Sequence, residues 1–461
     1  MDNSDKQYHQ IAQLTTAQSD APLDRIGYGS CGSIWADSSL FPYIDIYGCN
    51  SSSTEPITSV GEEAVFPIVL KRADGLPDRS LTNEAVIHRH ILSTLDKFNS
   101  DNQQCSASSP AGPRLDGGGN IFTDGHVVNI PRHVAFFEPS APMWNQILPR
   151  LPSDSTTCQA LVSERILPLP RDSRALLANK FWDGPAHLRE NIVNDKRNEH
   201  CLVRPYLGRR RCRNLKAGTQ RTTEEEGDEN KVMVDERPGH LRLKTRGLIS
   251  LRNYPLHVDQ IEELVLPAGE YAAAMADALA FLLWGCEVDA CDVEFVLARP
   301  RPQDSLAHDM ASIGTRKFST SNLGPHALWI LDFDCCKPLS MTMEGVYLAA
   351  ERFWRNDPYY PTPTSTSGTS GDASNNNLKN KTGNDEFLWK IFKGLFLEVS
   401  TRIMDWKLET KTAAWKSDGQ VEGTYGGQAR QQKLLPVEFI KRVEETVGVY
   451  SKGIPIFFSS S

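Results

Sequence analysis

Three spaced glycines near the start of the chain constrain the fold more than any other feature of the sequence. The run Arg25–Trp35 contains Gly27-x-Gly29-x-x-Gly32, with apolar residues on both sides. Glycine reaches backbone conformations that other residues rarely adopt, so closely spaced glycines favour a tight turn. The apolar residues that flank them are typical of strands. The sequence therefore predicts two strands joined by a glycine-rich turn.

Two charged residues follow this turn, and their order along the chain indicates a functional site. A second strand-like run, Val65–Lys71, ends in Lys71, and a helix predicted over Leu81–Leu92 carries Glu84. Taken alone, Lys71 fits a solvated lysine at a strand end equally well, and Glu84 fits a surface charge on a helix. Taken together, the order resembles the small lobe of protein kinases and of aminoglycoside-type phosphotransferases. In that lobe, glycines let the backbone approach phosphates and a helix glutamate holds the lysine.

The rest of the chain completes this expected organisation. Further strands are predicted at Arg132–Phe137 and Leu161–Ile166, a long helix at Glu270–Trp284, and closing helices at Phe387–Trp406 and Val437–Val447. We expect an α+β, two-lobed, protein-kinase-like fold with a β-rich small lobe and a mainly helical large lobe. Residues 1–22 are expected to be disordered. The small lobe is expected at 23–167, with an insertion at 97–125, and the large lobe at 168–461, with a disordered linker at 361–385.

Composition excludes several classes of protein. The chain has 461 residues with 50 basic and 58 acidic side chains, a net charge of −8, which rules out a globally basic nucleic-acid coat. No apolar run reaches the roughly 20 residues of a membrane span, and the first residues lack a secretory pattern. Ten cysteines without a Cys-x-x-Cys pair predict neither a disulfide scaffold nor a zinc cage. We expect a cytoplasmic protein that binds no membrane, no DNA and no metal ion.

An acidic segment follows another buried strand. Leu328–Leu331 reads as that strand, and Asp332-Phe333-Asp334 comes directly after it. A carboxylate at the end of a buried strand is costly unless it pairs or binds a cation, so Asp332 is a candidate functional residue. The segment resembles the metal-binding Asp-Phe-Gly segment of kinases, in the variant with an acidic third residue seen among small-molecule phosphotransferases.

The expected catalytic loop departs from the kinase pattern. It falls at 285–297, after the long helix, and aligning Phe295-Val296-Leu297 with the following strand puts Ala290 at the base position and Phe295 at the asparagine position. The usual machinery for phosphoryl transfer is therefore broken.

A group of carboxylates occupies this loop instead. It consists of Asp289, Asp292 and Glu294, and in an extended segment Asp292 and Glu294 share one face. Two carboxylates on one face repel, so one pKa should rise unless a cation lies between them. Such a pair can act as a general base for an amine or bind a guanidinium bidentately. The alternative is a solvated acidic loop.

Four runs in the second half of the chain resemble a fungal family whose members carry a domain of unknown function, DUF3669, sometimes labelled a zinc-finger protein. They are Met275–Leu282, Asp292–Leu297, Leu328–Asp334 and Phe353–Pro361, the last reading Phe-Trp-Arg-Asn-Asp-Pro-Tyr-Tyr-Pro. Characterised members of that family are arginine-containing cyclodipeptide synthases, which take amino acids from aminoacyl-tRNAs, one of them arginyl-tRNA, for secondary metabolism.

The resemblance implies a set of roles for the candidate residues. The family depends on an Asp-Asp-x-x-Glu motif, and the nearest equivalent here is Asp289-x-x-Asp292-x-Glu294, which would bind the arginyl group or serve as base. No cofactor is implied, because an aminoacyl ester is already activated. The cleft, with a role toward the phosphates of the CCA end, would be shaped by Gly27, Gly29, Gly32, Lys71, Glu84 and Asp332. A basic cluster would contact the phosphates of the two aminoacyl-tRNAs; it comprises Arg204, Arg209, Arg210, Arg211, Arg213 and Lys216.

Two other functions fit the same sequence. The first is an ATP- and magnesium-dependent phosphotransferase on a small molecule, which would use Lys71, Glu84 and Asp332. The second is a catalytically dead, pseudokinase-like interaction protein. For the basic cluster, the alternative is a solvated loop neutralised by Glu224–Glu226.

Overall fold

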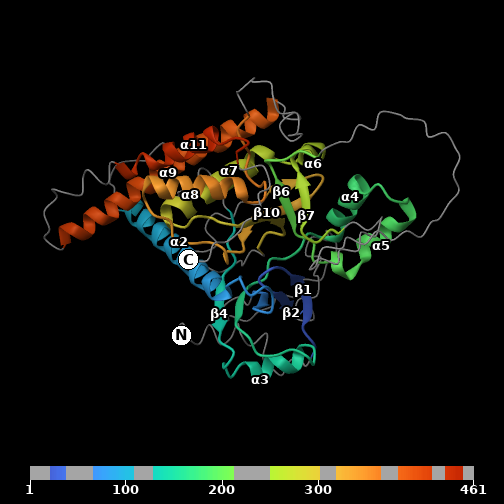
Figure 1. The fold of residues 1–461 in the computed structure, drawn as a ribbon. Coiled ribbons are helices and arrows are strands. Elements are labelled where there is room, and N and C mark those ends of the chain that lie inside the picture. Colours follow the sequence, from blue (N-terminus) through green and yellow to red (C-terminus); the bar gives the residue numbers. More distant parts are fainter. Residues whose placement is uncertain are drawn as a thin grey trace.

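The structure, a computed structural model, describes residues 21–37, 66–107, 128–211, 250–301, 318–364, 383–417 and 431–449. Helices and two five-stranded sheets are mixed along the chain, so the protein is α+β, as predicted (Figure 1). Most of the N-terminal segment 1–22, of the insertion 97–125 and of the linker 361–385 lies outside the described residues.

The first sheet contains the predicted glycine-rich turn. Its strands are all antiparallel in the order β1-β2-β3-β5-β4. Gly29 and Gly32 exchange backbone hydrogen bonds of 2.9 and 3.2 Å across the turn between β1 and β2. Gly32 has a φ of +147°, and a Cβ there would lie 1.9 Å from the Arg72 carbonyl oxygen, so the turn requires glycine at this position. The strands are β1 (Asp24–Tyr28), β2 (Ser33–Ala36), β3 (Ile68–Arg72), β4 (His133–Phe137) and β5 (Ala160–Glu164).

The long helix α2 (Leu81–Ala107) connects β3 to the strands on the other side of this sheet. Its apolar face is buried, and Leu81 and Ala85 pack with Leu161 of β5. The prediction of a helix beginning at Leu81 is confirmed. The helix is longer than the predicted Leu81–Leu92, because it continues to Ala107 and so into the segment where we expected an insertion.

The second sheet was only partly predicted. Its order is β7-β6-β8-β10-β9, with β6 and β7 parallel and the other pairs antiparallel. We expected two short strands in this region, and they correspond to β8 and β10. The strands β6 and β7 each contain a proline, which removes a backbone donor and weakens the strand pattern. The five are β6 (Val203–Tyr206), β7 (Tyr254–His257), β8 (Glu294–Ala298), β9 (Phe318–Thr320) and β10 (Gly324–Leu331).

A layer of helices packs beside the second sheet (Figure 1). The predicted long helix is α7 (Ala268–Ala280), which continues as a π-helical turn, η5 (Phe281–Gly285), and packs along α9 (Gly383–Ser417). Small side chains on α7 allow this close approach. The helices α8 (Met343–Arg355) and α11 (Leu435–Glu445) pack against each other. The remaining helices are α3 (Trp144–Ile147), η2 (Leu148–Arg150), α4 (Arg171–Phe181), α5 (Arg189–Asn194), α6 (Val258–Glu263), η3 (Ala186–Leu188) and η4 (Lys196–Asn198).

None of the helices in the described ranges is both long enough and apolar enough to cross a bilayer.

A buried ion pair joins the two sheets. Glu164, at the end of β5, receives two hydrogen bonds of 2.7 Å from the guanidinium of Arg301, which follows β8. The backbone N–H of Arg132 donates to the same carboxylate at 3.0 Å, and the Arg301 guanidinium lies over the Trp329 ring of β10 at 5.0 Å. Because Glu164 is buried and Arg301 is mostly covered, the carboxylate depends on the guanidinium for its charge to be tolerated.

Replacing Glu164 with alanine should therefore destabilise the protein strongly. Breaking a buried pair by removing one partner costs about 3–5 kcal/mol of unfolding free energy, measured by urea denaturation. The control is Glu398→Ala, which removes an exposed pair with Arg402 one turn away on α9 and should cost no more than about 0.5 kcal/mol. Similar losses for the two variants would show that the pair with Arg301 does not hold the sheets together.

Candidate functional site

A cavity of about 640 Å³ is lined by residues from both sheets. One wall is the glycine-rich turn, including Gly27, Gly29 and Gly32, and the end of β3. The opposite wall is the start of β8 and the segment that follows β10. Residues predicted from distant parts of the sequence therefore meet around one cavity.

The ammonium of Lys71 lies at the centre of the polar contacts in this cavity. Its Nζ donates to Glu84 Oε2 of α2 at 2.7 Å and to Asp332 Oδ1 at 2.8 Å. Burial alone would lower the pKa of Lys71, but the Asp332 and Glu84 carboxylates raise it well above its usual value. Burial raises the pKa of Glu84 to about 7 although Lys71 opposes the shift. The expectation that a helix glutamate holds Lys71 is confirmed.

Asp332 has an unusual backbone. Its φ is +68°, in the left-handed region that side chains other than glycine rarely adopt. Such strain persists only where the surrounding structure imposes it, and here the conformation turns the carboxylate toward Lys71.

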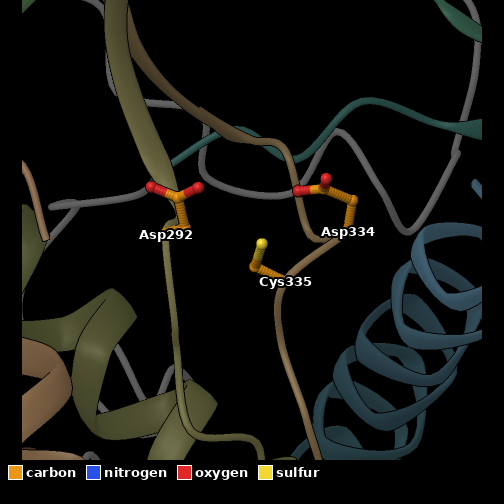
Figure 2. Close-up of side chains that lie close together, drawn as sticks. All are labelled: Asp292, Asp334 and Cys335. Carbon is orange, nitrogen blue, oxygen red and sulfur yellow. The ribbon is translucent and has the colours of Figure 1, made fainter. Parts of the chain in front are cut away.

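Asp292 belongs to a compact group with Asp334 and Cys335 (Figure 2). One ligand atom from each of the three lies within 4.8 Å of the others, so the group could hold a metal ion. A protein cation occupies this position, because Arg79 Nη1 donates to Asp292 Oδ2 at 2.8 Å, to Asp334 Oδ2 at 3.1 Å and to the Cys335 thiol. The guanidinium of Arg79 therefore offsets one of the two carboxylate charges of this group.

Glu294 lies at the start of β8 and also faces the cavity. Its carboxylate pairs with the guanidinium of Arg204, which also contacts Asp357 at 3.4 Å. Burial raises the pKa of Glu294 to about 7, Arg204 opposes this, and the neighbouring Asp332 charge adds to it. One pKa in the acidic pair rises, as predicted, but burial is the main cause and repulsion by Asp292 contributes least.

Asp289 does not join Asp292 and Glu294 at the cavity, and the predicted three-residue cluster is wrong in this respect. It is buried, and its Oδ1 accepts from the backbone N–H of Lys337 at 2.9 Å and of Cys291 at 3.2 Å. Its Oδ2 lies 3.7 Å from Arg352 Nε. Asp289 therefore holds the loop in place instead of facing a substrate.

The positions that would serve phosphoryl transfer carry no polar side chain. Phe295 is fully buried and packs edge-on against Tyr359 and Tyr360, with ring centroids 5.6 and 5.7 Å away. Ala290 is buried with a φ of +49°, and its carbonyl accepts from Asn356 Nδ2 at 2.8 Å.

The predicted phosphate-binding arginines are mostly engaged within the chain. Arg204 lines the cavity with Glu294 instead of lying on an outer surface. Arg210 pairs with Glu262 and Asp385, and Arg211 pairs with Asp259. Arg209 is exposed, whereas Arg213 and Lys216 lie outside the described residues. Arg210 and Arg211 are therefore neutralised by carboxylates other than the expected Glu224–Glu226.

Sequence reasoning missed Arg79, Asn356 and Asp357. Asn356 accepts from the backbone N–H of Asp292 at 2.8 Å, and Asp357 accepts from the Tyr206 hydroxyl at 2.6 Å. Arg79 is 213 residues from Asp292, so no local pattern connects them. The Asn356-Asp357 pair stood within a run that resembled the DUF3669 family, and that was the available signal.

Comparison with known proteins supports part of this resemblance. A family model, DUF3669, described as a zinc finger protein, matches residues 328–407. The matched stretch contains Asp332, Asp334, Asn356 and Asp357. No curated protein and no solved structure matches the chain. Across the part of the chain that the structure describes, cysteines and histidines do not gather into the four-ligand set of a structural zinc site.

The raised pKa of Glu294 predicts how a Glu294→Gln variant responds to pH. The folded protein keeps the proton on this carboxyl up to about pH 7, whereas the unfolded chain loses it near the ordinary glutamate pKa of 4.5. This side chain therefore stabilises the fold at low pH and loses that contribution as pH rises to about 7. The melting temperature of Glu294→Gln should improve relative to the parent protein between about pH 5 and about pH 8.

The comparison is made by thermal unfolding at each pH, with Glu398→Gln as a control for an exposed carboxylate on α9. A difference between Glu294→Gln and the parent that stays constant with pH would mean that the pKa of Glu294 is not raised in the folded protein.

Proposed function

We propose that this protein is an aminoacyl-tRNA-dependent cyclodipeptide synthase that joins arginine, taken from arginyl-tRNA, to a second amino acid. The proposal depends mainly on the large cavity and on its acidic wall, which is formed by Asp292, Glu294 and Asp357. In this wall, Glu294 has a pKa of about 7. The match to DUF3669 over residues 328–407, together with the similarity of the other runs to its fungal members, supports the same function.

Glu294 suits the role of general base in this reaction. An α-amine attacks an ester only in its neutral form, and a base works best when its pKa is close to the operating pH. Glu294 takes the proton from the ammonium. The amine nitrogen then forms a bond to the ester carbonyl carbon, the bond from that carbon to the ribose oxygen breaks, and this oxygen takes up a proton. A second attack of the same kind closes the ring, and the ester supplies the free energy, so ATP is not needed.

The acidic wall also suits an arginyl side chain. Asp292 and Asp357 line the cavity and are about half exposed, at 50% and 47%. Each already accepts hydrogen bonds from a protein arginine, but a carboxylate has about four acceptor positions. A second guanidinium can therefore bind, in the bidentate geometry that lysine cannot reproduce.

We infer that the chain has the two-lobed arrangement of protein kinases. The sheet order β1-β2-β3-β5-β4, the helix that follows β3 and the Lys71–Glu84 ion pair support this inference. The division into a small lobe at 23–167 and a large lobe at 168–461 belongs to the same proposal. The cavity would then be a nucleotide cleft adapted to the end of a tRNA.

A second candidate, an ATP- and magnesium-dependent phosphotransferase, is favoured by one observation. Lys71, Glu84 and Asp332 have the contacts that such enzymes use to hold phosphates and metal. The buried Phe295 and the side chain of Ala290 count against it, because neither can bind metal or accept a proton. A pseudokinase-like interaction protein would show no turnover.

One assay separates these functions. Purified protein is incubated with a mixture of charged tRNAs, with and without ATP, and products are identified by mass spectrometry. A cyclic dipeptide containing arginine should form in both conditions. Absence of a cyclic dipeptide together with ATP consumption would contradict the proposal and favour the phosphotransferase.

Glu294→Gln should abolish most of the product. Loss of a positioned general base lowers the rate by about 10²–10⁴-fold, and the rate of the parent protein should rise with pH and level off above about pH 7. Glu398→Gln, on the exposed face of α9, should retain the parent rate. Full activity in a folded Glu294→Gln protein would mean that another group is the base.

A further inference from the structure

Two carboxylates and one thiol converge beside the cavity, in the group of Asp292, Asp334 and Cys335 (Figure 2). Asp292 precedes β8 and lines the cavity, whereas Asp334 and Cys335 follow β10. The two strands pair antiparallel, with Glu294 opposite Leu331, so the segments that flank these strand ends are held side by side. The sheet therefore fixes the relative positions of the three side chains.

The single nitrogen Arg79 Nη1 faces more acceptor atoms than it has hydrogens. It lies 2.8 Å from Asp292 Oδ2 and 3.1 and 3.3 Å from the two Asp334 oxygens, and it also contacts the Cys335 sulfur. A guanidinium nitrogen of this kind carries two hydrogens, so it cannot make a well-aligned hydrogen bond to each of four atoms. Four potential ligand atoms around one point suit a metal ion, which binds without directed hydrogens.

The carboxylate of Asp334 is incompletely satisfied by Arg79. Its side chain is 1% exposed, and within the described part of the chain its oxygens accept hydrogen bonds from Arg79 Nη1 alone. Both contacts are longer than the roughly 2.7–2.9 Å that is usual between charged groups. The Lys71 ammonium, the other cation of this region, is bound by Glu84 and Asp332. A buried carboxylate in this situation favours a stronger positive charge than Arg79 provides.

The donor set indicates which class of metal ion would bind. Zn²⁺ and similar ions accept thiolate and carboxylate ligands together, whereas Mg²⁺ and Ca²⁺ prefer oxygen alone. Zinc–oxygen bonds are about 2.0–2.2 Å long, so the carboxylate oxygens would move inward by about 1 Å from their present distances to Arg79 Nη1. Asp292 is half exposed and lines the cavity, which leaves a fourth ligand position open on that side.

Arg79 is placed where its side chain can move away. It belongs to the segment between β3 and α2, and its neighbours Asp78 and Ser80 are exposed. Its backbone N–H donates to the Leu76 carbonyl at 3.2 Å, a bond that does not involve the side chain. The guanidinium can therefore leave the group while the local turn stays in place.

We propose that Asp292, Asp334 and Cys335 bind a divalent transition-metal ion of the Zn²⁺ type, which takes the place of the Arg79 guanidinium. As the metal–sulfur bond forms, the S–H bond of Cys335 breaks and its proton passes to solvent. The expectation of no metal ion relied on the spacing between cysteines, which cannot reveal a set with one thiol. The proposed function assigns no metal to this group, so the two proposals are tested separately.

The test is titration of the full-length protein with Co²⁺, after treatment with a chelator and without substrate. Co²⁺ substitutes for Zn²⁺, and a cobalt–thiolate bond produces a charge-transfer absorption band in the near ultraviolet. The band should saturate at a single Co²⁺ per chain and disappear when Zn²⁺ is added. A parent protein that binds neither ion, or binds Co²⁺ without the band, would overturn the proposal.

Three variants test the assignment of the ligands and of Arg79. Cys335→Ser should remove the band, and Asp334→Asn should weaken binding by at least about 10–100-fold, the loss caused by removing even an outer partner of a metal ligand. Arg79→Met, which keeps every ligand, should tighten binding about tenfold or more, because a hydrogen bond to a charged group no longer competes.

The matched controls are Cys158→Ser and Arg171→Met. Cys158 is partly buried like Cys335 but lies before β5, and Arg171 pairs with Glu190 on the surface. Neither change should alter the band or the affinity, and thermal unfolding shows that each variant is folded. A band that persists in folded Cys335→Ser, or an affinity that Arg79→Met leaves unchanged, would also overturn the proposal.

Discussion

The Lys71 ammonium, held between the carboxylates of Glu84 and Asp332, is the interaction on which the rest of the structure depends. Lys71 and Glu84 are well buried and Asp332 is partly so, and none of these charges would be tolerated without the others. Because they belong to β3, to α2 and to the segment after β10, one cation fixes the first sheet, the long helix and the second sheet relative to one another. The cavity exists where these three elements meet.

Pairing between arginine and carboxylate groups organises much of the remaining polar structure. Arg79 pairs with both Asp292 and Asp334, while Arg204 pairs with Glu294. Such pairs reduce the electrostatic repulsion between the carboxylates that face the same cavity. They also determine which acids keep unused acceptor positions toward the cavity.

Sequence patterns predicted elements that are set by local chemistry. The glycine-rich turn follows from glycine spacing, and the pairing of Lys71 with Glu84 was implied by the resemblance of their order to a kinase small lobe. The alternation that placed Asp292 and Glu294 on one face assumed extended backbone, but Glu287, Ala290 and Asp292 all have positive φ. These left-handed backbone conformations direct the side chain of Asp289 inward, and no pattern in the sequence predicts them. The partners of Arg79 and Arg210 were equally unpredictable, because an ion pair between distant segments exists only once the chain is folded.

The π-helical turn at the end of α7 has a structural role that depends on its extra residue. It closes with a bond from Cys286 N–H to the Phe281 carbonyl at 2.9 Å, five residues apart, and the carbonyls of Trp284 and Gly285 accept from Lys407 of α9. Deleting one residue there would convert the wide turn into an α-helical turn, so the change in length would be absorbed within the turn itself. The loop that holds Asp289 and Asp292 would keep its direction, but the carbonyls that accept from Lys407 would gain α-helical partners. The wide turn therefore supplies the backbone acceptors that attach α9 to the end of α7.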